Sequence, residues 1–219
     1  MNRISESDTK TLILDAAEQA FADLGFDSAS LRHIISVAGV NLAAVHYHFG
    51  SKEALIEAVF SRRLTPLNKE RLKLLDQLEA EAGKSPLNVE KVIGVLIGPA
   101  LRLARDPGKG GPVVMRLFGR TIAEPSEQLQ KLMHGQFGDV IRRFTAAFRC
   151  ALPGLPEDVL YWRIQFVIGA MAHIMCDPTG LKTMSGGLCD PNDTEKAISE
   201  MVTFLATGMR AEVSKRRKK

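Results

Sequence analysis

The stretch SLRHIISVAGVNLAAVHYHFGSKEAL, residues 30–55, decides the fold of this chain. Ser30 precedes a short apolar pattern that Gly39 ends, and Asn41 precedes a second short pattern that reaches His48. Serine and asparagine are favoured at helix N-caps, and glycine commonly follows the last residue of a helix. Two short helices joined by a turn that contains glycine are typical of a helix-turn-helix unit.

Longer helices are predicted on both sides of this unit. Apolar residues recur at helical spacing over 11–24, and Gly25 follows as a stop. Ser51 is placed to cap a helix whose pattern continues to about residue 82, with Pro66 as a candidate kink. The sequence therefore predicts three helices at the N-terminus, followed by a long connecting helix.

The helical period continues through the rest of the chain. Apolar patterns cover 89–105, 112–123, 126–152, 156–176 and 193–210, and the breaks fall where proline and glycine cluster. The sequence shows no strand pattern and no internal repeat. The predicted fold class is all-α. The predicted parts are a helix-turn-helix domain at 1–50, a connecting helix at 51–82, a C-terminal helical domain at 83–214 and a basic tail at 215–219.

The composition is that of a soluble protein that packs mainly with aliphatic side chains. Hydrophobic residues make up 45% of the chain and aromatic residues 6%. No uninterrupted apolar run reaches the roughly 18–20 residues of a membrane span. Cys150, Cys176 and Cys189 lack the paired spacing of a zinc site and are interpreted as reduced thiols. We therefore expect a cytoplasmic protein with no metal, no cofactor and no membrane partner.

The distribution of charge is more informative than the net charge. The net charge is +4, but the tail at 215–219 supplies five positive charges, so the body without the tail has a net charge of −1. No Asp or Glu occurs at 28–51. A polyanion therefore meets no local repulsion along this stretch.

Residues 9–60 resemble the DNA-binding signature of the TetR family of bacterial transcription regulators. The resemblance rests on the AGV turn at 38–40, the aromatic and histidine residues that end the second short helix, and the SKEAL sequence at 51–55. It implies an all-helical homodimer that binds an inverted-repeat operator, with the second short helix in the major groove as the recognition helix.

The resemblance places base contacts at the start of the recognition helix and phosphate contacts near it. The implied phosphate contacts of the first short helix are Ser30 and Arg32. The implied base contacts are Asn41, Leu42, Ala43 and Ala44. Because these side chains are mostly small, contact with thymine methyl groups or readout of DNA shape has to share the specificity.

Lys52 and the HYH sequence at 46–48 extend this surface. Lys52 lies in the first turn of a helix, where the helix dipole disfavours a cation, so a bound phosphate would stabilise it; a solvated lysine is the alternative. His46, Tyr47 and His48 are long enough to reach the DNA backbone. Many family members have tyrosine at the position of His46, so this histidine makes a weaker phosphate contact or reads a base. The i, i+2 spacing of the histidines points them to different helix faces, which argues against a metal site.

The C-terminal part resembles more narrowly the PsrA-type regulators, which respond to long-chain fatty acids. The stretches VVMRLFGRTIAEP at 113–125, YWRIQFVIGAMAHIM at 161–175 and FLATGMRAE at 204–212 carry this resemblance. Apolar stripes at helical spacing are typical of a solid bundle core, whereas the resemblance favours a ligand tunnel. The candidate ligand-binding residues are Met115, Arg116, Phe118, His134, Phe137, Ile141, Trp162 and Phe166.

A dimer interface is predicted on the helix at 156–176. This helix is apolar around most of its circumference and so needs partners on more than one side. Gly169, Ala170 and Ala172, together with Trp162, are the candidate interface residues, because small residues let another backbone approach closely. The family builds this interface from its last two long helices, here 156–176 and 193–210, as a four-helix bundle between subunits.

Two other classes of function are weighed against a ligand-responsive repressor. An enzyme acting on a small apolar substrate lacks catalytic residues, because GKGG at 108–111 does not have P-loop spacing and the histidines have no nucleophile or carboxylate at a recognisable spacing. An architectural DNA-binding protein without an effector would leave most of 83–155 without a role. The tail is interpreted as a solubilising end rather than as a basic arm on DNA. The sequence thus favours a repressor that a long-chain fatty acid or its acyl thioester releases from operator DNA.

Overall fold

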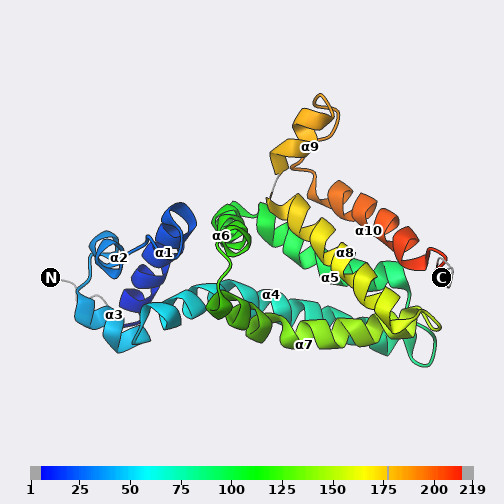
Figure 1. The fold of residues 1–219 in the computed structure, drawn as a ribbon, viewed down its shortest axis with the longest axis horizontal. Helices are drawn as coiled ribbons and strands as arrows, with labels where there is room; N and C mark the ends of the chain where they lie inside the picture. Colours follow the sequence, from blue (N-terminus) through cyan, green and yellow to red (C-terminus); the bar gives the residue numbers. More distant parts are fainter. Residues whose placement is uncertain (1–5, 177, 214–219) are drawn as a thin grey trace, which may run out of the picture. The chain divides into compact units, whose positions relative to one another are not determined.

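The computed structural model describes residues 6–176 and 178–213, and this part of the chain is helical and contains no strand (Figure 1). The predicted basic tail lies outside the described residues. The helices are α1 (Glu6–Leu24), α2 (Leu31–Ala38), α3 (Leu42–Phe49), α4 (Lys52–Ala82), α5 (Val89–Arg105), α6 (Gly111–Ala123), α7 (Glu127–Ala151), α8 (Glu157–Cys176), α9 (Pro178–Met184) and α10 (Thr194–Arg210), with a 3₁₀ turn η1 at Pro107–Lys109. The predicted all-α class is confirmed.

α4 agrees with the sequence prediction and one other element differs from it. α4 continues through Pro66 to Ala82 as predicted, because proline removes only one hydrogen bond of a packed helix. α9 lies inside the break expected at 177–192, since seven residues are too few to show a helical period.

The chain forms two compact units, and both are discontinuous in sequence. Met1–Pro66 and Asp106–Gln136 form one, here called the N-terminal unit; Leu67–Arg105 and Phe137–Lys219 form the other, the C-terminal unit. α4 passes from the first unit into the second at Pro66, and α7 passes between them after Gln136. The division at 50 and 82 remains a prediction about function, whereas packing groups α6 with the first three helices.

Aromatic rings join the helices of the N-terminal unit. Phe21 of α1 lies 5.8 Å from Phe26 in the following turn, Phe26 lies 5.9 Å from Phe60 of α4, and Phe60 lies 6.0 Å from Phe118 of α6, all between ring centroids. Tilted and edge-to-face pairs of this kind add to the stabilisation from burial alone. Phe118, a candidate ligand-binding residue, therefore has a packing role in the N-terminal unit.

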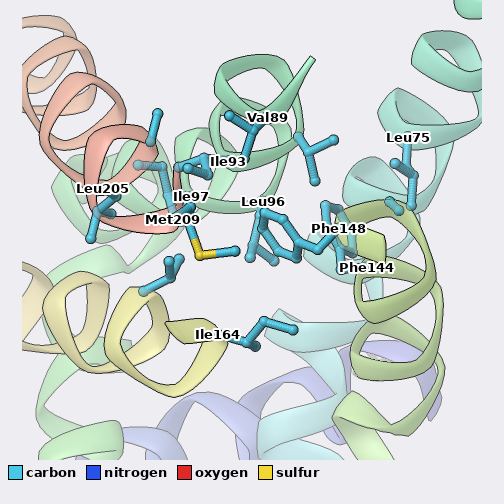
Figure 2. Close-up of a cluster of buried hydrophobic side chains, with 14 of the residues drawn as sticks. Leu75, Val89, Ile93, Leu96, Ile97, Phe144, Phe148, Ile164, Leu205 and Met209 are labelled. Atoms are coloured by element: carbon cyan, nitrogen blue, oxygen red, sulfur yellow. The ribbon is translucent and has the colours of Figure 1, made fainter. Parts of the chain in front are cut away.

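The core of the C-terminal unit is built by side chains from α4, α5, α7, α8 and α10 that point toward one another (Figure 2). Burial is nearly complete at its centre, where Ile93, Ile97 and Phe148 are each 0% exposed. Stripes at helical spacing on α5 and α7 supply half of the buried residues of this core, as their sequence pattern predicts.

A buried carboxylate ties α1 to α4 within the N-terminal unit. Glu18 is 4% exposed and forms ion pairs with Arg62 and Arg63, and the Arg63–Glu18 distance is 3.0 Å. The two guanidinium groups offset the loss of hydration that burial imposes on the carboxylate. Removing the carboxylate would leave the two guanidinium groups without this counter-ion, and removing the guanidinium groups would leave a buried carboxylate without one.

Glu18→Gln should therefore destabilise the fold. We expect the free energy of unfolding to fall by about 2–3 kcal/mol, because charge-assisted hydrogen bonds to a buried group are lost. Urea unfolding followed by circular dichroism measures this. Asp15→Asn is the matched control: Asp15 also pairs with Arg62, at 2.6 Å, but its side chain is 60% exposed. Its loss should stay below about 1 kcal/mol, and equal losses in the two variants would contradict the role of burial.

Candidate nucleic-acid interface

The two short helices of the N-terminal unit begin with the predicted caps. The Ser30 side chain accepts a hydrogen bond from the His33 N–H at 3.1 Å, and the Asn41 side chain accepts one from the Ala44 N–H at 2.9 Å. Gly39 ends α2 with φ of 65°, in the left-handed region that glycine enters without a steric penalty. These caps fix the point and the direction at which α3 leaves the turn.

α3 has one buried side and a wide exposed side. Val45 is 1% exposed, whereas Leu42 is 43% and Tyr47 75% exposed. The predicted DNA-contacting residues lie mainly on solvent-accessible positions of this part of the fold. Ser30, Arg32, Asn41, Leu42, Ala43, His46 and Tyr47 are exposed, and Ala44, His48 and Lys52 are half-buried.

His46 already uses one ring nitrogen inside the protein. Its Nδ1 lies 2.9 Å from the Gly50 carbonyl oxygen. A carbonyl oxygen only accepts, so Nδ1 donates to it and Nε2 remains available to DNA. Nε2 accepts from a base amino group if the ring is neutral and donates to a phosphate if the ring is charged, so both roles that the sequence left open for His46 stay predictions.

The other two residues of the HYH sequence contact each other and α1. The rings of Tyr47 and His48 meet edge to face with centroids 5.1 Å apart. A hydrogen bond to the Glu6 carboxylate, together with its negative charge, raises the pKa of Tyr47. Glu6 precedes the acid-free stretch in sequence, so the charge pattern gave no sign of this carboxylate beside the recognition helix.

The first turn of α4 holds an anionic group of its own. Glu53 accepts hydrogen bonds from its own backbone N–H and from the Ser51 hydroxyl, and these bonds lower the pKa of the Glu53 carboxyl. The Ser51 side chain also accepts from the Ala54 N–H at 3.1 Å, and Lys52 Nζ donates to the Asp27 carbonyl at 3.2 Å. The N-terminal end of α4 therefore stabilises negative charge, and the helix dipole contributes to this effect. A DNA phosphate bound there would compete with the Glu53 carboxylate for the same site.

α6 caps the C-terminal end of α1. Arg120 donates to the carbonyl oxygens of Asp23 at 2.7 Å and of Ala22 at 3.4 Å, while Glu124 accepts from the Phe26 N–H at 3.2 Å. Arg116 pairs with the Asp23 carboxylate at 3.2 Å. Cations favour the carbonyl end of a helix. Arg116, a candidate ligand-binding residue, thus has its guanidinium engaged with α1 in this structure, and its contact with a ligand stays a prediction.

The candidate ligand-binding residues are divided between the two units. Trp162 and Phe166 are 64% and 61% exposed in the single chain, with their ring centroids 6.0 Å apart on α8, so they fit an outer surface better than a cavity. His134 and Ile141 are also exposed, and Phe137 is half-buried. Met115, Arg116, Phe118 and His134 belong to the N-terminal unit, and Phe137, Ile141, Trp162 and Phe166 to the C-terminal unit.

Each unit has a hollow that is open to solvent. The hollow in the N-terminal unit has a volume of about 970 Å³ and is lined by α4 and α7, with charged residues of both signs such as Lys52, Glu57 and Lys131. The groove between α4 and α5 of the C-terminal unit, of about 370 Å³, is lined mainly by apolar residues such as Leu74, Leu78 and Val95. Neither is an enclosed tunnel of the kind that the sequence led us to expect.

α8 presents an apolar face that the single chain does not cover. Gly169 is exposed, and no heavy atom outside its own helix lies within 4 Å of the place a Cβ would take. Ala170 and Ala172 are half-buried, and Phe204 on neighbouring α10 is 76% exposed. By length and composition alone α8 could cross a membrane, contrary to our expectation, because such a helix tolerates the few polar residues that interrupt its apolar run. A helix packed against a second subunit has the same composition.

Comparison with known proteins agrees with this geometry. Residues 13–59 match the model described as "Bacterial regulatory proteins, tetR family", and residues 94–208 match "Tetracyclin repressor-like, C-terminal domain". The fold and the exposed recognition helix define a helix-turn-helix transcriptional regulator with a helical C-terminal domain. The chain belongs to the TetR family.

Relatives share mainly the N-terminal part. UidR of Escherichia coli K12, an HTH-type transcriptional regulator, is 43% identical over 51 residues, which are 23% of this chain and 26% of UidR. The nicotine-responsive repressor HdnoR of Paenarthrobacter nicotinovorans is 38% identical over 77 residues, 35% of this chain and 40% of HdnoR. The chain thus matches about a quarter and two fifths of their lengths.

A solved structure extends the likeness to the whole fold. FadR from Bacillus subtilis, solved in complex with stearoyl-CoA, has a TM-score of 0.62, covers 90% of this chain and 98% of its own, and is 13% identical. The TetR-family prediction is confirmed. The narrower resemblance to PsrA-type regulators stays a prediction.

Asn41 caps α3 and is also a candidate base contact, and substitution separates the two roles. Asn41→Ala removes the acceptor for the Ala44 N–H and should lower the free energy of unfolding by about 1 kcal/mol. Asn41→Asp keeps an acceptor at the cap and should retain stability near that of the wild type. Chemical denaturation of the three proteins checks this, and a loss in Asn41→Asp as large as in Asn41→Ala would refute the cap.

Proposed function

We propose that the protein is a homodimeric repressor that binds an inverted-repeat operator and is released by a long-chain fatty acid or its acyl thioester. The observation that carries the DNA-binding part is the exposed, acid-free surface of α2 and α3, held by the Ser30 and Asn41 caps in a chain of the TetR family. Relatives named as transcriptional regulators support regulation rather than catalysis.

The recognition surface indicates how specificity is divided. Leu42, Ala43 and Ala44 offer apolar contact to thymine methyl groups, while Asn41 and the free Nε2 of His46 are available to base edges. Arg32 and Lys52 supply cations that neutralise phosphates, which adds affinity without sequence preference. Two such surfaces in a dimer would read half-sites about 34–36 Å apart.

Three substitutions on this surface should change DNA binding in different ways. Ala44→Glu places a carboxylate in the groove and should abolish operator binding. Lys52→Ala should weaken binding to all sequences and reduce the salt dependence of binding by roughly one phosphate contact. Glu53→Gln should strengthen DNA binding, because a phosphate then meets no competing carboxylate. Fluorescence anisotropy at several salt concentrations measures all three.

Ala146→Glu is the control, because Ala146 is an exposed helical alanine of the C-terminal unit. It should bind operator like the wild type. Operator affinity retained in Ala44→Glu would show that α3 is not the recognition helix.

The apolar face of α8 and α10 supports a dimer in which a second copy covers it. Trp162, Phe166 and Phe204 are large apolar side chains exposed to water in the single chain, and contiguous surfaces of this kind mark protein interfaces. Gly169 leaves room beside them for a partner helix.

Gly169→Arg should convert the dimer into a monomer, because it inserts a long cation where helices are expected to approach. Light scattering at micromolar concentration measures the mass. Gly135→Arg is the control, because Gly135 is an exposed helical glycine with equally open space around its Cβ position. A dimeric Gly169→Arg variant would place the interface elsewhere.

Two observations support a hydrophobic effector. The solved neighbours include FadR with stearoyl-CoA and SmeT with triclosan, both of which hold hydrophobic ligands in the same fold. The C-terminal unit has a large apolar core, and each buried methylene contributes about 0.8 kcal/mol to the affinity of an acyl chain.

α4 provides the route from effector to DNA. Its first half carries Lys52 and the two arginines that hold Glu18, and its second half lies in the core of the C-terminal unit. A ligand that displaces the second half therefore acts on a helix fixed to α1. Linkage requires the ligand and the operator to weaken each other's binding equally, commonly by about 5- to 150-fold.

Titration of a preformed protein–operator complex tests the effector. At fixed salt and below its micelle concentration, at least one of oleate and oleoyl-CoA should raise the operator dissociation constant by about 5- to 150-fold, and butyrate should leave it unchanged. If neither long-chain compound acts, the fatty-acid function is wrong, although the chain remains a TetR-family regulator.

A further inference from the structure

Arg71, in the second half of α4, is a buried cation whose described partners are all neutral. It is 3% exposed. Its Nε donates to the Leu96 carbonyl at 2.8 Å, Nη1 to Asn68 Oδ1 at 3.3 Å and Nη2 to the Met171 sulfur at 3.5 Å. No carboxylate among the described residues forms an ion pair with it.

The surface arginines of the C-terminal unit differ from Arg71. Exposed ones pair with carboxylates, as Arg102 does with Glu195 at 2.7 Å and Arg142 with Asp139 at 2.9 Å, whereas the half-buried Arg163 donates to the carbonyl oxygens of Met209 and Ala211. Among the described residues, Glu70, the exposed neighbour of Arg71 in sequence, contributes a negative charge that acts on the guanidinium. The cation with the least water around it therefore lacks the counter-ion that its exposed counterparts have.

The charge of Arg71 persists despite burial. Desolvation lowers its pKa to about 10, so the guanidinium is still protonated at neutral pH. A buried charge without a counter-ion is unfavourable, and a planar guanidinium binds a carboxylate through two parallel hydrogen bonds. Thioether sulfur is a weak acceptor on a flexible side chain, so Met171 can yield its place to a stronger acceptor.

We propose that Arg71 pairs with the carboxylate of a free long-chain acid, which enters the C-terminal unit head group first and displaces the Met171 sulfur. This inference rests on the proposed function, because it assigns the head-group site of the same effector. Leu96, whose carbonyl already holds the guanidinium, points its side chain into the apolar cluster (Figure 2), so an acyl chain bound at Arg71 has apolar surface beside it.

The same site discriminates against derivatives of the acid. An acyl thioester or amide presents a neutral carbonyl to the guanidinium and leaves the buried charge uncompensated. The charged groups of a coenzyme A thioester lie on a bulky head that would have to be buried as well. The Arg71 site therefore selects the free acid over its thioester as the effector.

The experiment compares oleate with oleamide, which has the same chain and a neutral head, and with oleoyl-CoA, on the wild-type dimer bound to operator. We expect oleate to release the operator, and we expect oleamide and oleoyl-CoA each to need at least about 30-fold higher concentration, because neither presents a carboxylate to the buried charge. Arg71→Met should lose the oleate response, bind operator normally without ligand, and unfold at a temperature no lower than the wild type, because an apolar side chain replaces an uncompensated charge.

Arg142→Met is the matched control, because its side chain is 70% exposed and pairs with Asp139 on the same helix. It should respond to oleate like the wild type. Oleamide as effective as oleate, an unchanged response in Arg71→Met, or a marked fall in its unfolding temperature would each overturn the role of Arg71 while leaving a fatty-acid effector in place. Failure of all three compounds on the wild type would instead remove the proposed function together with its head-group site.

Discussion

The ion pairs of Glu18 with Arg62 and Arg63 hold α1 against the first half of α4, and the rest of the N-terminal unit is arranged around that attachment. α2 and α3 pack on α1, and α6 caps its C-terminal end through Arg120. The recognition helix α3 is therefore positioned within its unit by its packing on α1 and α2. Its position is set through α1, and α1 is set by α4 and α6.

The half of α4 that follows Pro66 is held by a second group of contacts, in the C-terminal unit. There it contributes Leu75 to the apolar core and Arg71 to a polar site within that core. α4 thus carries charged side chains in two settings: Arg62 and Arg63 are half-buried and pair with the buried Glu18 of α1, whereas Arg71 is buried and its described partners are neutral. The first favours a rigid attachment, whereas the second favours the binding of an anion. This difference is the physical basis for assigning DNA positioning to the first half of α4 and effector response to the second.

Local features of the sequence were sufficient for much of this structure. The Ser30 and Asn41 caps, the Gly39 turn and the apolar stripes of α5 and α7 each depend on residues within a few positions of one another, so their patterns predicted the elements directly. The exposed face of α3 followed from the same patterns. Because α8 is apolar around most of its circumference, the sequence also indicated a surface that needs a partner. The exposure of Trp162 in the single chain agrees with that prediction.

Features that depend on distant partners could not be predicted in this way. Arg116 was expected to face a ligand, but it pairs with Asp23, 93 residues away in sequence, and α6 consequently belongs with the N-terminal unit. Nothing in the charge pattern separates Arg71 from the paired arginines, because the absence of a counter-ion is a property of the packed core. Glu6 beside Tyr47 similarly places a carboxylate near a surface that seemed free of acidic groups in sequence.

The distance between the two N-terminal units of a dimer tests the coupling through α4 most directly. A spin label at Val37, which is 60% exposed on α2, would report it by pulsed electron resonance after the three exposed cysteines are replaced by serine. The proposed mechanism predicts that oleate shifts the inter-label distance distribution of the free dimer and that operator DNA shifts it in the opposite sense. A distribution that oleate leaves unchanged, in a protein that still binds oleate, would contradict it.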